Sequence, residues 1–150
     1  MSATVVRLAA PEDASRIAVM MREFYGHERL QYGPSVAVAL GSLLSDRTQG
    51  RAWLFQVDDE DAGYLVLTWG YSLEFGGRFG LVDELYVRPR YRGAGLGTRG
   101  VRAALDECRD HGARSVRLEV DHTNLDAARL YTRLGFTVDP RNILTHRLHG

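Results

Sequence analysis

The chain has 150 residues, of which 45% are hydrophobic and 25% charged, and this globular composition argues against a disordered protein. Nineteen basic residues balance nineteen acidic ones, which argues against a general nucleic-acid-binding protein. No run of about 18 uncharged apolar residues predicts a membrane-spanning helix, and the N-terminus lacks the pattern of a signal peptide. We therefore expect a cytoplasmic protein that forms one domain over residues 1–150 and has neither a nucleic-acid nor a membrane partner.

The first half of the chain predicts two helices and four strands. Pro11 and the two acids after it suit the first turn of a helix that ends near Glu28, and a second helix is expected over residues 36–44. Runs rich in β-branched and aromatic residues, bounded by turn residues, predict the strands. These cover residues 4–8, 53–57, 62–72 and 79–87.

The second half predicts two amphipathic helices and three short strands. Apolar residues at helical spacing indicate a helix over residues 96–111, ended by Gly112, with Cys108 in its buried stripe. After a strand over residues 116–120, a capping box of Thr123 and Asp126 opens a helix that ends at Gly135.

Strands over residues 136–138 and 143–148 complete the chain. The predicted order is therefore β-α-α-β-β-β-α-β-α-β-β. This order indicates an α/β fold in which a mixed sheet has helices on its faces. The single cysteine and the acidic residues show no metal-ligand spacing, so no metal is expected.

The strand that ends at Val87 leads into a glycine-rich loop that opens directly into a helix. Glycines at positions 93, 95 and 97 let the backbone approach a ligand closely, and a helix N-terminus offers free N–H groups and positive potential. Residues 88–117 carry eight arginines against three acids, so the surroundings are basic. The pattern indicates a site for a phosphate or pyrophosphate.

Two other phosphate-binding patterns can be compared with this loop. Gly95-x-Gly97-x-x-Gly100 matches the dinucleotide fingerprint, but five residues separate Val87 from Gly93, whereas the fingerprint begins immediately after a strand. The 50 residues after Gly100 are also too few to complete a doubly wound fold. The chain contains no lysine, which excludes a Walker loop and any lysine nucleophile.

Two motifs of the chain resemble those of the GCN5-related N-acetyltransferase (GNAT) superfamily. The family motif [Gln/Arg]-x-x-Gly-x-[Gly/Ala] is present as Arg92-Gly93-Ala94-Gly95-Leu96-Gly97, between a predicted strand and a predicted helix. The second motif, Asn-x-x-Ala-x-x-x-Tyr-x-x-x-Gly-Phe, runs from Asn124 to Phe136. The predicted order of elements also matches the family along the full chain. The resemblance implies the single-domain acyl-CoA N-acyltransferase fold.

The resemblance also implies acetyl-CoA as the cosubstrate. In the family, loop amides bind the pyrophosphate, and the end of the preceding strand pairs with the pantetheine arm beside a gap between strands. An asparagine of the second motif contacts the cofactor arm, although Asn124 is equally suited to cap a helix. The corresponding residues here are Leu85, Tyr86, Val87, Arg92, Gly93, Ala94, Gly95, Leu96, Gly97, Thr98 and Asn124. Which arginine contacts the 3′-phosphate stays open.

The candidate catalytic residues are Asp83, Glu84 and Tyr131. An attacking amine has an ordinary pKa of about 10 and must lose a proton, for which a carboxylate is a suitable base. Alternation places Asp83 and Glu84 on opposite faces of their strand. Several relatives carry the base nine residues before the first motif, at Asp83 here, but strands of the family often bulge at this point, which would exchange the faces. The resemblance places Tyr131 in the general-acid position; the alternative is an aromatic residue packed on the sheet.

The expected function is acetyl-CoA-dependent N-acetylation of a primary amine on a small molecule, by direct transfer. The acceptor is expected to contact residues 24–34 and also Trp69, Tyr71, Glu74 and Phe75. Two other functions fit the same fold, a non-catalytic acyl-CoA-binding or regulatory module and an acetyltransferase for proteins or peptides. The acceptor stays open, and a homodimer is compatible with the family.

Overall fold

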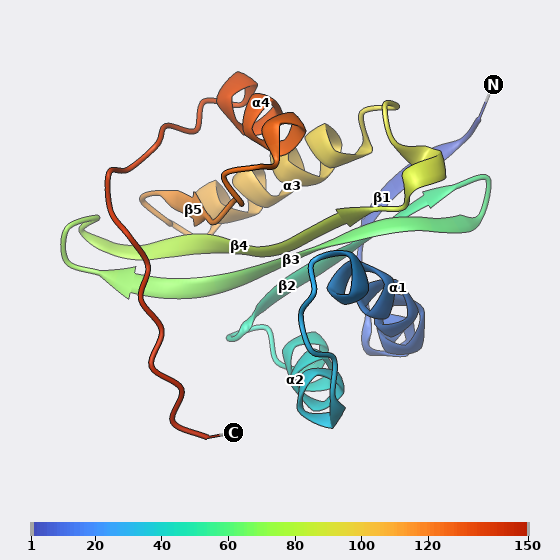
Figure 1. Cartoon of the computed structure of the whole chain (residues 1–150), viewed down its shortest axis with the longest axis horizontal. Helices are drawn as coiled ribbons and strands as arrows, with labels where there is room; N and C mark the ends of the chain where they lie inside the picture. The colour runs from blue at the N-terminus through green and yellow to red at the C-terminus, as the bar shows by residue number, and fades with distance from the viewer. Residues whose placement is uncertain (1, 150) are drawn as a thin grey trace. The chain divides into compact units, whose positions relative to one another are not determined.

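The computed structural model of the protein describes residues 2–149. They form two compact units, the first ending at Glu119 and the second beginning at Val120. The first unit contains a five-stranded sheet in the order β1-β2-β3-β4-β5 (Figure 1). The second unit contains the helix α4 (Leu125–Arg133). None of the helices in residues 2–149 has the length and apolar character needed to cross a lipid bilayer.

The sheet is mixed, as predicted. Its strands are β1 (Thr4–Leu8), β2 (Gly50–Val57), β3 (Glu60–Ser72), β4 (Gly77–Val87) and β5 (Val116–Leu118). The first four are antiparallel neighbours, and β5 lies parallel to β4. Three strands begin two or three residues earlier than predicted, since Gly50 and Gly77 pair with β3 although glycine is a poor strand former.

Three helices of the first unit cover the two faces of the sheet. They are α1 (Ala14–His27), α2 (Pro34–Ser45) and α3 (Leu96–Asp110), and two short 3-10 turns, η1 (Pro11–Asp13) and η2 (Pro89–Tyr91), precede α1 and α3. Figure 1 shows α1 and α2 on one face of the sheet and α3 on the other. Gly112 adopts a positive φ of 73° just after α3, as predicted for the residue that ends this helix.

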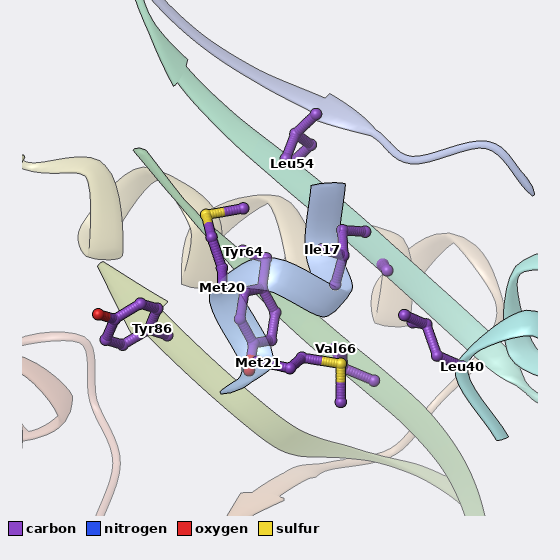
Figure 2. Packing of buried hydrophobic residues seen from close by; sticks show 9 residues of the cluster. Ile17, Met20, Met21, Leu40, Leu54, Tyr64, Val66 and Tyr86 are labelled. Atoms are coloured by element: carbon purple, nitrogen blue, oxygen red, sulfur yellow. The ribbon is translucent and has the colours of Figure 1, made fainter. Parts of the chain in front are cut away.

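The buried side chains of α1 pack against alternate residues of the central strands. Ile17 and Met20 of α1 are fully buried beside Leu54 of β2 and Tyr64 of β3 (Figure 2). The strand residues that alternate with Leu54 and Tyr64 point toward α3. Cys108 of α3 is buried there, as predicted. Each central strand therefore contributes to two hydrophobic layers, and α1 and α3 are held on opposite faces.

The last two predicted strands are not formed. Residues 136–138 and 143–148 adopt no regular secondary structure, and Val138 and Leu144 are 94% and 88% exposed. Backbone bonding there is local, as in the bond from Arg141 N–H to the Asp139 carbonyl (2.9 Å). A strand needs a neighbour for its backbone groups and burial for its apolar face. No strand among residues 2–149 pairs with these segments, and all of their residues except Phe136 are exposed. The strand predicted over residues 116–120 is likewise shorter, ending at Leu118.

The predicted capping box at the start of α4 is also wrong. Asn124 is the N-cap, and its side-chain oxygen accepts a hydrogen bond from Ala127 N–H (3.1 Å). Thr123 instead turns back, and its hydroxyl donates to Asp121 (2.7 Å). The bond from Asn124 reaches the third residue after the cap, as an N-cap side chain should.

The close packing of α3 on the sheet requires a glycine at position 100. A Cβ atom there would lie 2.3 Å from the Phe55 ring, so we expect Gly100→Ala to destabilise the protein by about 1–3 kcal/mol. Gly41, in α2, has open space around its Cβ position, and Gly41→Ala should stabilise the protein by up to about 1 kcal/mol. Urea unfolding of both variants measures the difference, and equal effects would contradict the packing argument.

Candidate functional site

A β-bulge at Asp83 changes the direction of the side chains along β4. The register between β3 and β4 shifts there and leaves Asp83 as the extra residue. Before the bulge, position 80 faces Cys108 of α3, and regular alternation would put residue 84 on that same face. Instead, the Glu84 side chain bonds to Tyr64 on the α1 face. The bulge anticipated in the sequence is therefore present, and it exchanges the faces.

The Glu84 carboxylate is held by two tyrosine hydroxyls. Tyr25 of α1 donates to Oε2 (2.5 Å), and Tyr64 of β3 donates to Oε1 (2.7 Å). Burial raises the pKa of Glu84, the two hydrogen bonds oppose that rise, and the charge of Asp83 adds to it. Within residues 2–149, Glu84 forms no ion pair. The site thus contains a desolvated carboxylate whose partners are neutral.

Asp83 differs from Glu84 in its exposure. The Asp83 side chain reaches solvent, but the surrounding protein still desolvates the carboxylate and raises its pKa. Both adjacent acids of β4 therefore bind a proton more readily than ordinary carboxylates. This property suits a general base that works near neutral pH.

A third carboxylate nearby, Glu23 of α1, is neutralised. Arg88 donates to both of its oxygens (2.7 and 3.0 Å), and the Tyr86 hydroxyl donates to one of them (3.1 Å). The Arg88 guanidinium holds the pKa of Glu23 below its usual range. This ion pair ties α1 to the end of β4, whereas Glu84 and Asp83 have no cationic partner among residues 2–149.

The edge of β4 that faces β5 is open beyond the bulge. The two strands pair only at Gly80, Leu81 and Val82, and β4 continues past the end of β5 (Figure 1). Among residues 2–149, no other strand pairs with this part of the edge. Beside residues 85–87, where a gap between strands was predicted, β4 therefore has an edge without a strand partner in the first unit.

The backbone groups of two residues point into this gap. Arg88 N–H donates to the Ala62 carbonyl of the neighbouring chain segment (2.8 Å), so alternation turns the N–H and C=O of Leu85 and Val87 away from β3. The Val87 carbonyl accepts a hydrogen bond from the Arg92 side chain (2.8 Å). The open edge can pair with a ligand that carries amide groups.

The glycine loop brings a free helix N-terminus to the end of β4. Gly93 and Gly95 adopt positive φ values of 82° and 83°, which favour glycine. Gly95 caps α3 without a side-chain hydrogen bond, and the first turn of α3 contains no acid. The first intrahelical bond comes from Arg99 N–H, so the N–H groups of residues 96–98 are free of helical acceptors. Such groups bind phosphate.

The second unit holds the remaining predicted residues, Asn124 and Tyr131. Because the Asn124 side-chain oxygen caps α4, its amide N–H groups are left as donors. The Tyr131 ring packs edge-on against Phe136, with centroids 5.7 Å apart. Burial raises the pKa of Tyr131 to about 12, so its hydroxyl carries a proton at neutral pH.

The predicted acceptor residues separate into two groups. Tyr25 lies in the expected segment 24–34 and contacts Glu84. Trp69, by contrast, stacks on His111 at the end of α3 (5.4 Å), on the face opposite to Glu84. Tyr71 is 78% exposed, and it lies five residues along β3 from Val66, the residue that pairs with Glu84 in the sheet. The structure does not bring Trp69 and Tyr71 to the carboxylate.

Four residues that shape the site were given no role beside the carboxylates from the sequence, although Tyr25 lies in the segment expected to contact the acceptor. They are Glu23, Tyr25, Tyr64 and Arg88. A signal existed, because the two tyrosines interrupt the apolar stripes of α1 and β3 with a hydroxyl. Residues 2–149 contain no cluster of metal-binding side chains.

Comparisons with known proteins place these features in a family. The model of the acetyltransferase (GNAT) family matches residues 18–136. Thialysine N-epsilon-acetyltransferase of Mus musculus is 29% identical over 148 residues, covering 90% of this chain and 85% of that protein. The crystal structure of the integron cassette protein HFX_CASS3, from a salt-marsh metagenome, superposes with a TM-score of 0.86 at 34% identity, covering 97% of this chain and 91% of that one. Aminoglycoside N-acetyltransferase AAC(6')-Iy in complex with CoA has the same fold, with a TM-score of 0.85 at 13% identity over 99% of this chain and 97% of that one.

The ion pair of Glu23 predicts a pH-dependent contribution to stability. Since the folded pKa of Glu23 is lowered, its stabilisation is present above the unfolded pKa of about 4.3 and is lost as the pH falls through the folded value. Both side chains are partly exposed, so we expect Glu23→Gln to cost no more than about 1 kcal/mol at pH 7, and progressively less as the pH falls below the unfolded value. Urea unfolding at pH 7 and in acid measures this, with Glu28→Gln as the control; a loss that is as large in acid as at pH 7 would contradict it.

Proposed function

The chain belongs to the acetyltransferase (GNAT) family, and from that premise we propose that it transfers an acetyl group directly from acetyl-CoA to a primary amine of a small molecule. One juxtaposition carries the proposal. The open edge of β4 leads from a carboxylate of raised pKa, Glu84, to the free N-terminus of α3. A ligand that carries a thioester, two amides and a pyrophosphate fits this order of groups.

The residues of the first unit suit each part of acetyl-CoA, the cosubstrate of the family. The N–H and C=O groups of Leu85 and Val87 can pair with the amides of the pantetheine arm. The amides of the loop and of the first turn of α3, from Arg92 to Thr98, can bind the pyrophosphate. The family motif assigns a further contact with the cofactor arm to the side chain of Asn124.

The proposed reaction begins with removal of a proton from the acceptor ammonium by Glu84, directly or through water. The amine nitrogen then attacks the thioester carbonyl carbon, an N–C bond forms, and the C–S bond breaks. Leu85 N–H stabilises the charge that develops on the carbonyl oxygen. Tyr131, the acid that the family motif suggests, donates its proton to the departing thiolate. The second proton of the amine nitrogen, which is lost as the amide forms, passes through water and restores the Tyr131 hydroxyl. Asp83 is the other candidate base, and its charge raises the pKa of Glu84.

The charge of the site supports an amine as the acceptor. Glu84 lacks a cationic partner among the described residues, whereas the nearby Glu23 has Arg88, so a protonated amine supplies the charge that Glu84 is missing. A relative that covers most of the chain supports the same class of acceptor, since it is named for N-acetylation of thialysine.

We expect release of free CoA thiol when acetyl-CoA is combined with a panel of polyamines, amino acids, aminoglycosides and peptides. Small amines should be the better acceptors, and Glu84→Gln should abolish release with each of them. Turnover confined to peptides would contradict the small-molecule proposal, and release unaffected by Glu84→Gln would remove Glu84 as the base.

Acetyl-CoA at 100 times its Kd should increase the free energy of unfolding by about 2.7 kcal/mol, whereas NAD(H) should leave it unchanged.

Tyr131→Phe tests the acid. Phenylalanine keeps the ring that packs on Phe136, so stability and acetyl-CoA affinity should change little. A positioned acid contributes roughly 10²–10⁴-fold to a rate. Because the ordinary pKa of a thiol is about 8.5, its thiolate is a good leaving group even without protonation, so we expect a loss at the lower end of that range. Steady-state kinetics should show the loss in kcat and not in the KM for acetyl-CoA. A wild-type kcat would return Tyr131 to a packing role.

A further inference from the structure

Two tyrosines from different elements bracket the proposed base. We propose that Tyr25 and Tyr64 are positioning residues: they fix the orientation of the Glu84 carboxylate and hold it ionised, so that its remaining lone pairs receive the proton of the acceptor. The inference rests on the proposed function, since it assumes that Glu84 is the base. It adds two residues that the family motifs do not contain.

The geometry leaves the carboxylate one orientation. Tyr25 bonds to Oε2 and Tyr64 to Oε1, so rotation of the carboxylate would break at least one bond. A carboxylate offers about four acceptor positions, and two hydroxyls occupy only two of them. The remaining positions are available to an ammonium proton or a water molecule.

The packing of the two rings makes this bracket rigid. Tyr64 is fully buried, and its ring lies edge-on to Phe24, with centroids 6.5 Å apart. Tyr25 is edge-on to Phe24 (6.0 Å) and to Tyr32 (5.8 Å). Aromatic pairs of this kind restrict ring motion and add stability beyond burial. The donors are therefore already in place when the acceptor arrives.

The chemistry of the donors decides how Glu84 can act. Burial alone would favour the protonated acid, which cannot accept a proton, and the charge of Asp83 works in the same direction. The titratable groups that face Glu84 are Tyr25 from α1, Tyr64 from β3 and Asp83 beside it on β4. Since the tyrosines are neutral, they stabilise the carboxylate and leave its negative charge in place. An arginine would cancel that charge. The two hydrogen bonds thus favour the ionised form of Glu84, and that form retains its attraction for an ammonium group.

The proposal is tested by titrating Glu84 in the absence of substrates. In protein labelled with ¹³C at glutamate Cδ, the Glu84 resonance is identified by its loss in Glu84→Gln. Tyr25→Phe and Tyr64→Phe each remove one donor and keep the ring, so each should raise the pKa of Glu84 by about one unit. Tyr91→Phe, which removes a tyrosine–glutamate bond at Glu60, should leave it unchanged. An unmoved titration in both folded variants would overturn the proposal.

The same variants connect the titration to catalysis. The acid limb of kcat/KM, measured with acetyl-CoA and the best amine of the panel, should move upward by the same amount as the titration of Glu84. A structural role for the tyrosines would lower activity at every pH and leave this limb in place, and that result would overturn the proposal. Failure of the proposed function has a different signature, the absence of thiol release from the wild-type protein with every amine.

Discussion

The extra residue at Asp83 sets the direction of every side chain that follows it on β4. Without it, Glu84 would face the layer that contains Cys108 of α3, where an unpaired carboxylate costs several kcal/mol. With it, β4 contributes to the α3 layer up to Val82 and to the α1 layer from Glu84 onward. Pairing with β5 also ends at Val82. Side chain and backbone thus become available for a ligand at the same point of one strand.

The contrast between two glutamates gives this point its chemical character. Glu23 has Arg88, so its charge is balanced and its role is to hold α1 against β4. Glu84 has two hydroxyls and a second acid beside it, so its charge is unbalanced. A buried carboxylate without a cationic partner contributes less to the stability of a protein than one that is paired with an arginine. The unbalanced charge is therefore better explained by a cationic ligand than by stability.

Local patterns were sufficient for most elements between residues 4 and 118. Their periodicity and turn residues predicted the helices and strands, and the positive φ of Gly112 confirmed the end of α3. The local sequence pattern gave wrong strand predictions where strand formation depends on residues that are far away in the sequence. Gly50 joins β2 because β3 is there to pair with it, whereas residues 143–148 have strand-forming side chains but no neighbour that buries them.

The candidate site shows the same division. The pair Asp83 and Glu84 was found from the sequence, but the choice of face depended on a bulge, which is a property of the register with β3. The donors to Glu84 come from 59 residues before it (Tyr25) and 20 residues before it (Tyr64). No short motif connects such positions. Their hydroxyls on otherwise apolar stripes were the one available signal, and it becomes specific only when the fold brings the stripes together.

The glycines of the loop show why a motif alone does not assign a function. Gly95 and Gly100 both belong to the pattern that resembles a dinucleotide fingerprint, yet their physical roles differ. Gly95 has a positive φ and open space around it, so it shapes the loop and exposes the backbone. Gly100 has no such conformation and is required because Phe55 leaves no room for a Cβ atom. The fingerprint match therefore joins one residue of the glycine loop to one residue of the core. A more specific signal is the loop together with the open edge of β4, whose unpaired N–H and C=O groups can pair with a ligand that carries several amides in a row.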